Sequence, residues 1–137
     1  MLAYLEVEDK VRSILGNITG LNVVEYMPIV EIQKKGKIPA VFVLALEEEY
    51  PFPIGYGDHT LTIDIWVIDK TREKVAGWLD KVCDLLDENK HFTIEKEGKT
   101  LTCEVINRRL TYNLDVFTDS VGGGVLTTIK YYEGGVK

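Results

Sequence analysis

The sequence predicts an α+β protein: a mainly antiparallel β-sheet with two α-helices packed on one of its faces. Two segments carry apolar residues at helical spacing, several others alternate with a period of two, and most predicted strands follow one another through turn-forming residues. A chain of 137 residues has the size of one domain, so residues 1–137 are treated as a single unit. Such a chain buries enough surface to form a core without disulfides or bound metals.

The first helix is expected over residues 3–15, and Gly16 is placed to end it. Its apolar residues recur at helical spacing: Tyr4, Val7, Val11, Ile14 and Leu15. The next run, NVVEYMPIVEI, is rich in β-forming residues but contains Pro28, which indicates an edge strand or two short pieces. A loop, QKKGKIP, should lead into a strand over 40–46, which is apolar on both faces.

Residues 47–58, EEEYPFPIGYGD, are expected to form a long hairpin loop, because two prolines remove ladder donors and fix φ. The loop carries three aromatic side chains, Tyr50, Phe52 and Tyr56. Two readings remain open. The aromatic residues form a contact surface, or they fold back over the core.

The second helix is expected over 70–89, with Asp69 or Thr71 as its N-cap. A hairpin follows over 91–106, turning at Glu97-Gly98. RRLTYNLDVFT alternates as a further strand, GGG at 122–124 is expected to be a hairpin tip, and VLTTIKYYE is the last strand. The expected element order is α-β-β-β-α-β-β-β-β.

Composition excludes some classes of function. The net charge of −6 and the pI near 4.9 disfavour a dedicated nucleic-acid binder, which needs clustered Lys and Arg. No apolar run approaches a membrane span, and the acidic start MLAYLEVEDKV is unlike a secretory signal, so a cytoplasmic, non-membrane protein is expected. The spacing of Cys83 and Cys103 matches no zinc motif.

A search for catalytic chemistry finds no nucleophile elbow, no P-loop and no dinucleotide fingerprint. The stretch DHTLTIDIWVID gathers four ionisable residues, yet strand alternation puts His59 and Asp64 on opposite faces of the sheet. Cys83 lies beside the apolar stripe of its helix, where a thiol is inert. We therefore expect no catalytic residue, no cofactor and no metal, and a protein that is not an enzyme.

The same alternation leaves one sheet face with Thr60, Thr62, Asp64, Trp66 and Ile68, while both helices can stack on the other. A Trp and an Ile on an outer face need cover from this chain or from another subunit. Self-association is therefore a hypothesis. Its candidate interface residues are Tyr50, Phe52, Tyr56, Asp64, Trp66 and Ile68.

The layout of the chain resembles the tail-terminator and tail-completion (head–tail joining) proteins of long-tailed bacteriophages and related proviruses. The resemblance spans nearly the whole chain and rests on these pieces in order: VRSIL, EYMPIV, KIPAVFVL, LTIDIWVID, VAGWLDKVCDLLD and TIKYYE. The strand–helix junction at 63–87 is its strongest part. The aromatic-rich loop at 47–58 and the full hairpin at 91–106 depart from the family pattern.

The resemblance implies a structural virion protein, assembled in the host cytoplasm. It implies a hexameric ring that caps the tail tube and presents a surface to the head-completion protein, with no catalytic site. An acidic ring would also let DNA pass through without adsorbing it.

Two other functions remain open at this stage. One is a small ligand-binding or regulatory α+β domain in which the 47–58 loop forms a lid over a pocket. The other is an enzyme with His59, Asp58 and Tyr56 near one end of that loop.

Overall fold

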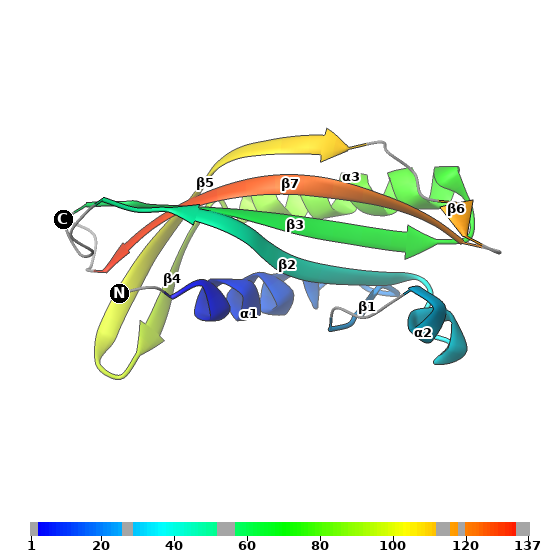
Figure 1. Ribbon diagram of the computed structural model, residues 1–137, viewed down its shortest axis with the longest axis horizontal. Helices are drawn as coiled ribbons and strands as arrows, with labels where there is room; N and C mark the ends of the chain where they lie inside the picture. Colours follow the sequence, from blue (N-terminus) through cyan, green and yellow to red (C-terminus); the bar gives the residue numbers. More distant parts are fainter. Residues whose placement is uncertain (1–2, 26–28, 52–56, 112–115, 118–119, 134–137) are drawn as a thin grey trace.

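The computed structural model describes residues 3–25, 29–51, 57–111, 116–117 and 120–133 of the chain (Figure 1). Within these ranges three helices and seven strands follow one another. In chain order they are α1 (Tyr4–Leu15), β1 (Asn22–Val23), α2 (Ile29–Lys34), β2 (Ala40–Glu49), β3 (His59–Asp69), α3 (Arg72–Glu88), β4 (His91–Lys96), β5 (Lys99–Thr111), β6 (Val116–Phe117) and β7 (Ser120–Glu133).

The strands form one sheet in the order β1-β2-β3-β7-β5-β4, with β6 paired to β7. All pairings are antiparallel except the short parallel pair of β1 and β2. Helix α3 lies behind the sheet and α1 runs beside β2 (Figure 1). The predicted α+β class is confirmed. No helix in the described part of the chain is long and apolar enough to cross a membrane.

The core lies between the helices and one sheet face, called here the helix face. On β3 the buried side chains of this face alternate with half-buried ones, as the sequence predicts. They are Leu61, Ile63, Ile65 and Val67. Helix α1 contributes Val7, Val11 and Leu15 to the same cluster, and α3 contributes Val75, Leu79, Val82 and Leu86. Thr71 caps α3 by accepting from the Lys74 N–H at 3.2 Å.

Strand β2 has an edge that β1 covers only at its first residues, and α1 covers the next part. Arg12 donates to the Val43 carbonyl at 2.9 Å, and Glu8 Oε2 accepts from the Ala45 N–H. Edge groups without partners invite pairing with other chains. Two charged side chains of one helix therefore take the place of a neighbouring strand.

A β-bulge interrupts β2 at Leu46, where the register with β3 shifts between Ala45 and Glu47. One extra residue reverses the alternation of side chains beyond it. Glu48 therefore points to the helix face opposite Leu61 instead of away from it.

Glycines 122–124 lie inside β7, opposite Trp66 to Ile68 of β3. The prediction of a hairpin tip there was wrong. A Cβ on Gly122 would lie 2.6 Å from Nε1 of Trp66, and one on Gly124 would lie 3.0 Å from its Cε3. The indole ring therefore packs directly on the β7 backbone, and only glycine leaves room for it.

The structure corrects other sequence predictions. The second half of NVVEYMPIVEI is not a strand, because Ile29–Lys34 form α2. The expected strand break before RRLTYNLDVFT is absent within 99–111, where β5 continues through a bulge at Ile106. The predicted loop at 47–58 begins as strand, since β2 runs to Glu49. In each case, packing across the sheet overrides a local turn or strand signal.

The close packing of Trp66 on the β7 glycines leads to a prediction about the stability of the protein. Gly122→Ala should destabilise the protein by about 1–3 kcal/mol, because the added methyl group overpacks against the indole. Urea denaturation followed by circular dichroism measures this change.

Gly77→Ala is the matched control, because a Cβ there meets no atom within 4 Å. It should raise stability by about 0.5–1 kcal/mol through better helix propensity. Equal stability of the two variants would contradict the packing described for Trp66.

Candidate functional site

A buried polar cluster joins β2, β3, β7 and the start of α1 on the helix face. Nδ1 of His59 lies 2.8 Å from Oε2 of Glu48. The Tyr131 hydroxyl donates to the same carboxylate, at 2.9 Å to Oε1 and 3.0 Å to Oε2, and accepts from the Ala3 N–H at 3.1 Å. The rings of His59 and Tyr131 stack with centroids 4.8 Å apart. We call Glu48, His59 and Tyr131 the polar cluster.

The groups of the polar cluster satisfy one another. A carboxylate only accepts hydrogen bonds, so its contact with His59 places a proton on Nδ1. Burial raises the pKa of the Tyr131 hydroxyl far above its ordinary value, and contact with Glu48 raises it further, so the hydroxyl remains a donor. His59 is only 3% exposed. The arrangement anchors the start of α1 on the sheet and offers little access to a substrate.

Of the residues proposed for an enzyme, the structure describes Asp58 and His59, and these two side chains have different partners. Asp58 lies beside Lys130, with 3.7 Å between its Oδ2 and the lysine Nζ, and Tyr56 lies outside the described residues. His59 instead meets Glu48 and Tyr131. Sequence reasoning missed this pairing because the bulge at Leu46 changes which face Glu48 occupies.

A small hollow lies next to the polar cluster, beside the predicted lid. Its volume is about 230 Å³ and its lining includes Tyr4, Leu61 and Tyr50. Tyr50 also stacks on His59, with ring centroids 5.6 Å apart. Small-molecule pockets usually measure ~300–1,000 Å³. The hollow is below that range.

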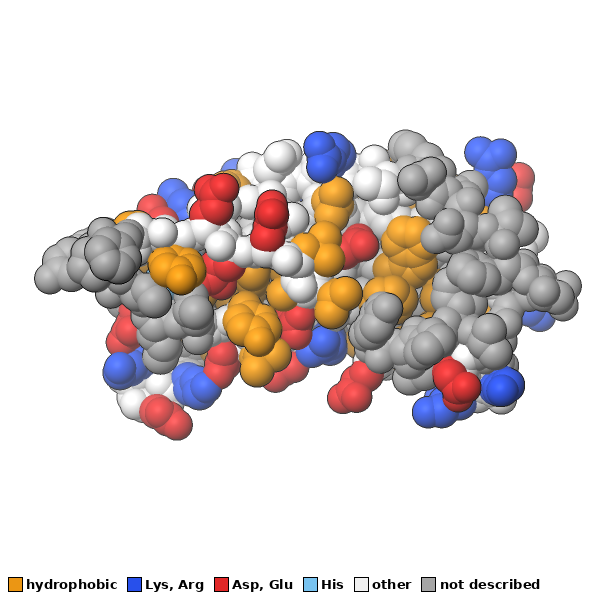
Figure 2. All heavy atoms as spheres, in the orientation of Figure 1, with side chains coloured by type: hydrophobic (Ala, Val, Ile, Leu, Met, Phe, Trp, Pro, Cys, Tyr) orange, Lys and Arg blue, Asp and Glu red, His pale blue; other side chains and the backbone are white. Residues whose placement is uncertain are grey.

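The opposite sheet face, called here the open face, carries an unusual carboxylate. Asp64 lies on β3 between Leu44 of β2 and Leu126 of β7. Its Oδ1 is buried and has no hydrogen-bond partner among the described residues. Burial raises the pKa of this carboxyl. Figure 2 looks onto this face and shows hydrophobic side chains gathered in patches among acidic ones.

The candidate interface residues differ in how available they are. Tyr50 is 42% exposed. Asp64 and Trp66 are half-buried, with Trp66 lying on the β7 glycines. Ile68 is fully buried, because α2 covers that end of the open face and Ile32 packs against it. Of the two alternatives for covering Ile68, this chain or another subunit, the structure shows cover by this chain. Phe52 and Tyr56 lie outside the described residues.

Neither cysteine has the setting of a nucleophile. Burial raises the pKa of the Cys83 thiol, as do three neighbouring aspartates, although Arg108 lowers it in part. Burial raises the pKa of Cys103 to about 12. Both stay protonated at neutral pH, the unreactive form. Among the residues that the structure describes, no group of three or more His, Cys, Asp or Glu could hold a metal ion.

Comparison with known proteins adds no assignment. No protein-family model matches this chain, and a search of curated proteins found no significant relative.

Removal of the Tyr131 hydroxyl tests the polar cluster. Tyr131→Phe leaves the Ala3 N–H without its acceptor and removes one donor from Glu48. The expected loss is about 1–3 kcal/mol of unfolding free energy, measured by urea denaturation. Tyr132→Phe is the matched control, because that hydroxyl makes no hydrogen bond to a described residue. An equal loss in both variants would contradict the structural role of the cluster.

Asp64 predicts a pH dependence of stability. Its raised folded-state pKa means that the folded protein binds more protons than the unfolded chain. Stability contributed by Asp64 is therefore lost as the pH rises from the ordinary carboxyl value of about 3.9 to the raised value. Asp64→Asn should remove this part of the dependence, as measured by thermal melting between pH 4 and 7.

The exposed Asp58 of the same sheet face provides the control for that experiment. Asp58→Asn removes the same charge at an exposed position and shows how much of any change follows from the loss of one carboxylate alone. If Asp64→Asn keeps the wild-type slope of melting temperature against pH, the burial of Asp64 does not govern the titration.

Proposed function

We propose that this chain is a structural assembly subunit of the tail-terminator type. In this role it forms a ring, with six subunits as the expected number, that caps a phage tail tube and joins it to the head-completion protein. It would act in the virion after assembly in the host cytoplasm. The proposal assigns no catalytic step, cofactor or metal to the chain.

The observation that carries this proposal is the buried Oδ1 of Asp64 on the open face, which has no hydrogen-bond partner among the described residues. Leaving a buried acceptor unsatisfied costs about 1–3 kcal/mol, so natural proteins rarely leave one without a reason. Asp64 sits between Leu44 and Leu126, which are both half-buried. An apolar surface around a carboxylate that lacks a donor suits contact with another chain that supplies one.

Two further features support the proposal. Helix α1, strands β2 and β3, helix α3 and strand β7 follow one another in the order of the pieces VRSIL, KIPAVFVL, LTIDIWVID, VAGWLDKVCDLLD and TIKYYE. The piece EYMPIV departs from this pattern, because its last residues begin α2. The net charge of −6 fits a ring through which DNA moves without adsorption. A lumen lined mainly by Lys and Arg would contradict this last point.

A charge placed on the open face tests the proposal. Leu126→Asp should prevent assembly at concentrations where the wild-type protein forms rings, because it sets a second carboxylate beside Asp64. Light scattering and negative-stain microscopy measure the size and symmetry of the assemblies.

Leu5→Asp is the matched control, since Leu5 lies on α1, away from the open face, and is 56% exposed. It should assemble as the wild type does. Circular dichroism checks that both variants fold. A folded Leu126→Asp variant that still forms rings would contradict assembly through the open face, and a strictly monomeric wild type at high concentration would contradict the ring.

A further inference from the structure

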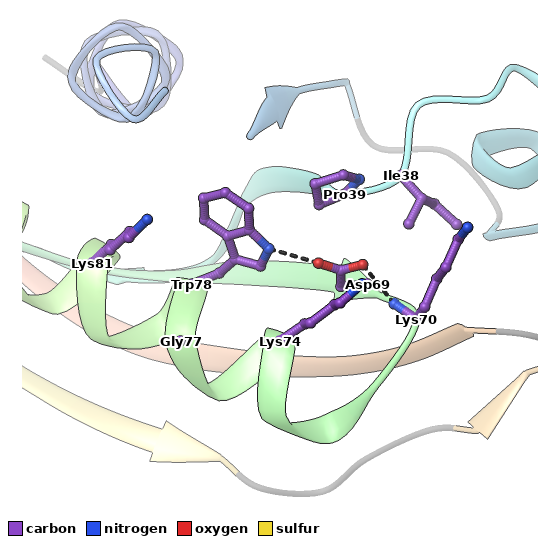
Figure 3. A pocket seen from close by; sticks show the side chains of 8 residues that line it. All are labelled: Ile38, Pro39, Asp69, Lys70, Lys74, Gly77, Trp78 and Lys81. Atoms are coloured by element: carbon purple, nitrogen blue, oxygen red, sulfur yellow. Dashed lines mark hydrogen bonds between the residues drawn. The ribbon is translucent and has the colours of Figure 1, made fainter. Parts of the chain in front are cut away.

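A pocket of about 480 Å³ opens beside α3, where the helix meets the start of β2. Figure 3 shows that its lining comes from the β3–α3 junction, one side of α3 and the segment before β2. The apolar part is formed by Ile38, Pro39 and the indole of Trp78. Three lysines, Lys70, Lys74 and Lys81, also line the pocket, together with Asp69 and Gly77. We call this hollow the lysine pocket.

The lysine pocket is positively charged although the chain is acidic. The lysine salt bridges among the described residues involve other lysines. Asp69 is the one carboxylate in the lining, and both of its oxygens are engaged: Oδ2 accepts from Trp78 Nε1 at 2.7 Å and Oδ1 from the Lys70 N–H at 2.7 Å. Lys81 Nζ lies 4.7 Å from the Trp78 ring centroid. The pocket therefore suits an anionic group attached to an apolar one.

The helix also leaves space for such a group. Gly77 lines the pocket in the middle of α3, and a Cβ there would meet no atom within 4 Å. A glycine inside a helix costs roughly 0.5–1 kcal/mol relative to alanine. Its effect here is an unobstructed approach to the helix backbone.

The chain itself contains a segment with the matching chemistry at the end of β2. The bulge leaves Leu46 51% exposed, and Tyr50 is 42% exposed. Between them, Glu47 and Glu49 point to the open face opposite Thr62 and Thr60. Neither glutamate forms a salt bridge with a described residue. This segment, Leu46–Tyr50, is called here the acidic end.

The acidic end cannot reach the lysine pocket of its own molecule. The pocket lies next to Ala40, and Glu49 lies nine residues further along β2. At the rise of a strand this separation is roughly 30 Å. Figure 1 shows the two regions at opposite ends of the long axis, the start of α3 at one and the end of β2 at the other.

We propose that the lysine pocket receives the acidic end of a second copy of this chain. Glu47 and Glu49 pair with the lysines, while Leu46 or Tyr50 packs against Trp78 and Pro39. Two different surfaces then meet head to tail, and such a contact closes into a ring when the rotation between copies allows it. The inference rests on the proposed function and adds the contact that links neighbouring subunits.

Charge reversal at the two ends tests the contact. The acidic-end variant is Glu47→Lys with Glu49→Lys, and the pocket variant is Lys74→Glu with Lys81→Glu. All four residues are exposed, so both variants should fold, as circular dichroism will show. Each variant alone should assemble at least about tenfold more weakly than the wild type, because like charges then face one another. Analytical ultracentrifugation at low ionic strength measures this.

An equimolar mixture of the two variants gives the sharpest readout. A lysine-bearing end then meets a glutamate-bearing pocket, and the native end of one variant meets the native pocket of the other. The mixture should regain wild-type assembly, and salt should weaken it. A symmetric contact between identical patches would not behave in this way.

Gly77→Leu blocks the pocket without changing charge. Leucine favours the helix more than glycine does, so this variant should fold. Weaker assembly of the folded variant would then result from loss of the contact. Gly77→Ala adds less bulk and serves as its control.

Three results would overturn the contact: assembly of either charge variant at wild-type strength, a mixture of folded variants that stays monomeric, or full assembly of Gly77→Leu. If rings persist in these variants but are lost in Leu126→Asp, the proposed function stands and only the head-to-tail contact fails. A wild type that never assembles overturns both.

Discussion

The β-bulge at Leu46 is the constraint on which much of this structure depends. It reverses the side-chain alternation of β2 and turns Glu48 toward the helix face, where it meets His59 and Tyr131. That cluster holds the first residues of α1 through the Ala3 N–H. The same reversal sends Glu47 and Glu49 to the other face. One inserted residue thus separates the internal carboxylate from the exposed ones.

The second constraint is that both long helices cover one face of the sheet. Because the long helices cover the helix face, only smaller elements and single side chains can cover the open face. At one end α2 packs Ile32 against Ile68, and the Trp66 ring lies on backbone that has no side chains beneath it. The middle of the open face, around Asp64, has neither kind of cover among the described residues. An uncovered centre beside a protected end is the shape expected of a contact surface.

Two surfaces of opposite charge lie toward opposite ends of the long axis. Glu47 and Glu49 mark one end, and the lysine pocket marks the other. A subunit with unlike ends has a built-in direction, which suits head-to-tail assembly better than a two-fold dimer. In the proposed ring, this head-to-tail contact and the open face around Asp64 together join neighbouring subunits.

Periodicity in the sequence was enough to determine α1, α3, the apolar side of β3 and the α+β class, because these depend on residues close in the chain. It also separated His59 from Asp64 correctly. The tertiary structure alone decided the rest. In the sequence, glycines 122–124 resemble a turn, but in the structure the Trp66 ring packs on them. Glu48 changes face because of a bulge that no local sequence signal indicates. The pairing of distant strands sets these features, and strand pairing is a property of the whole sheet rather than of any short stretch.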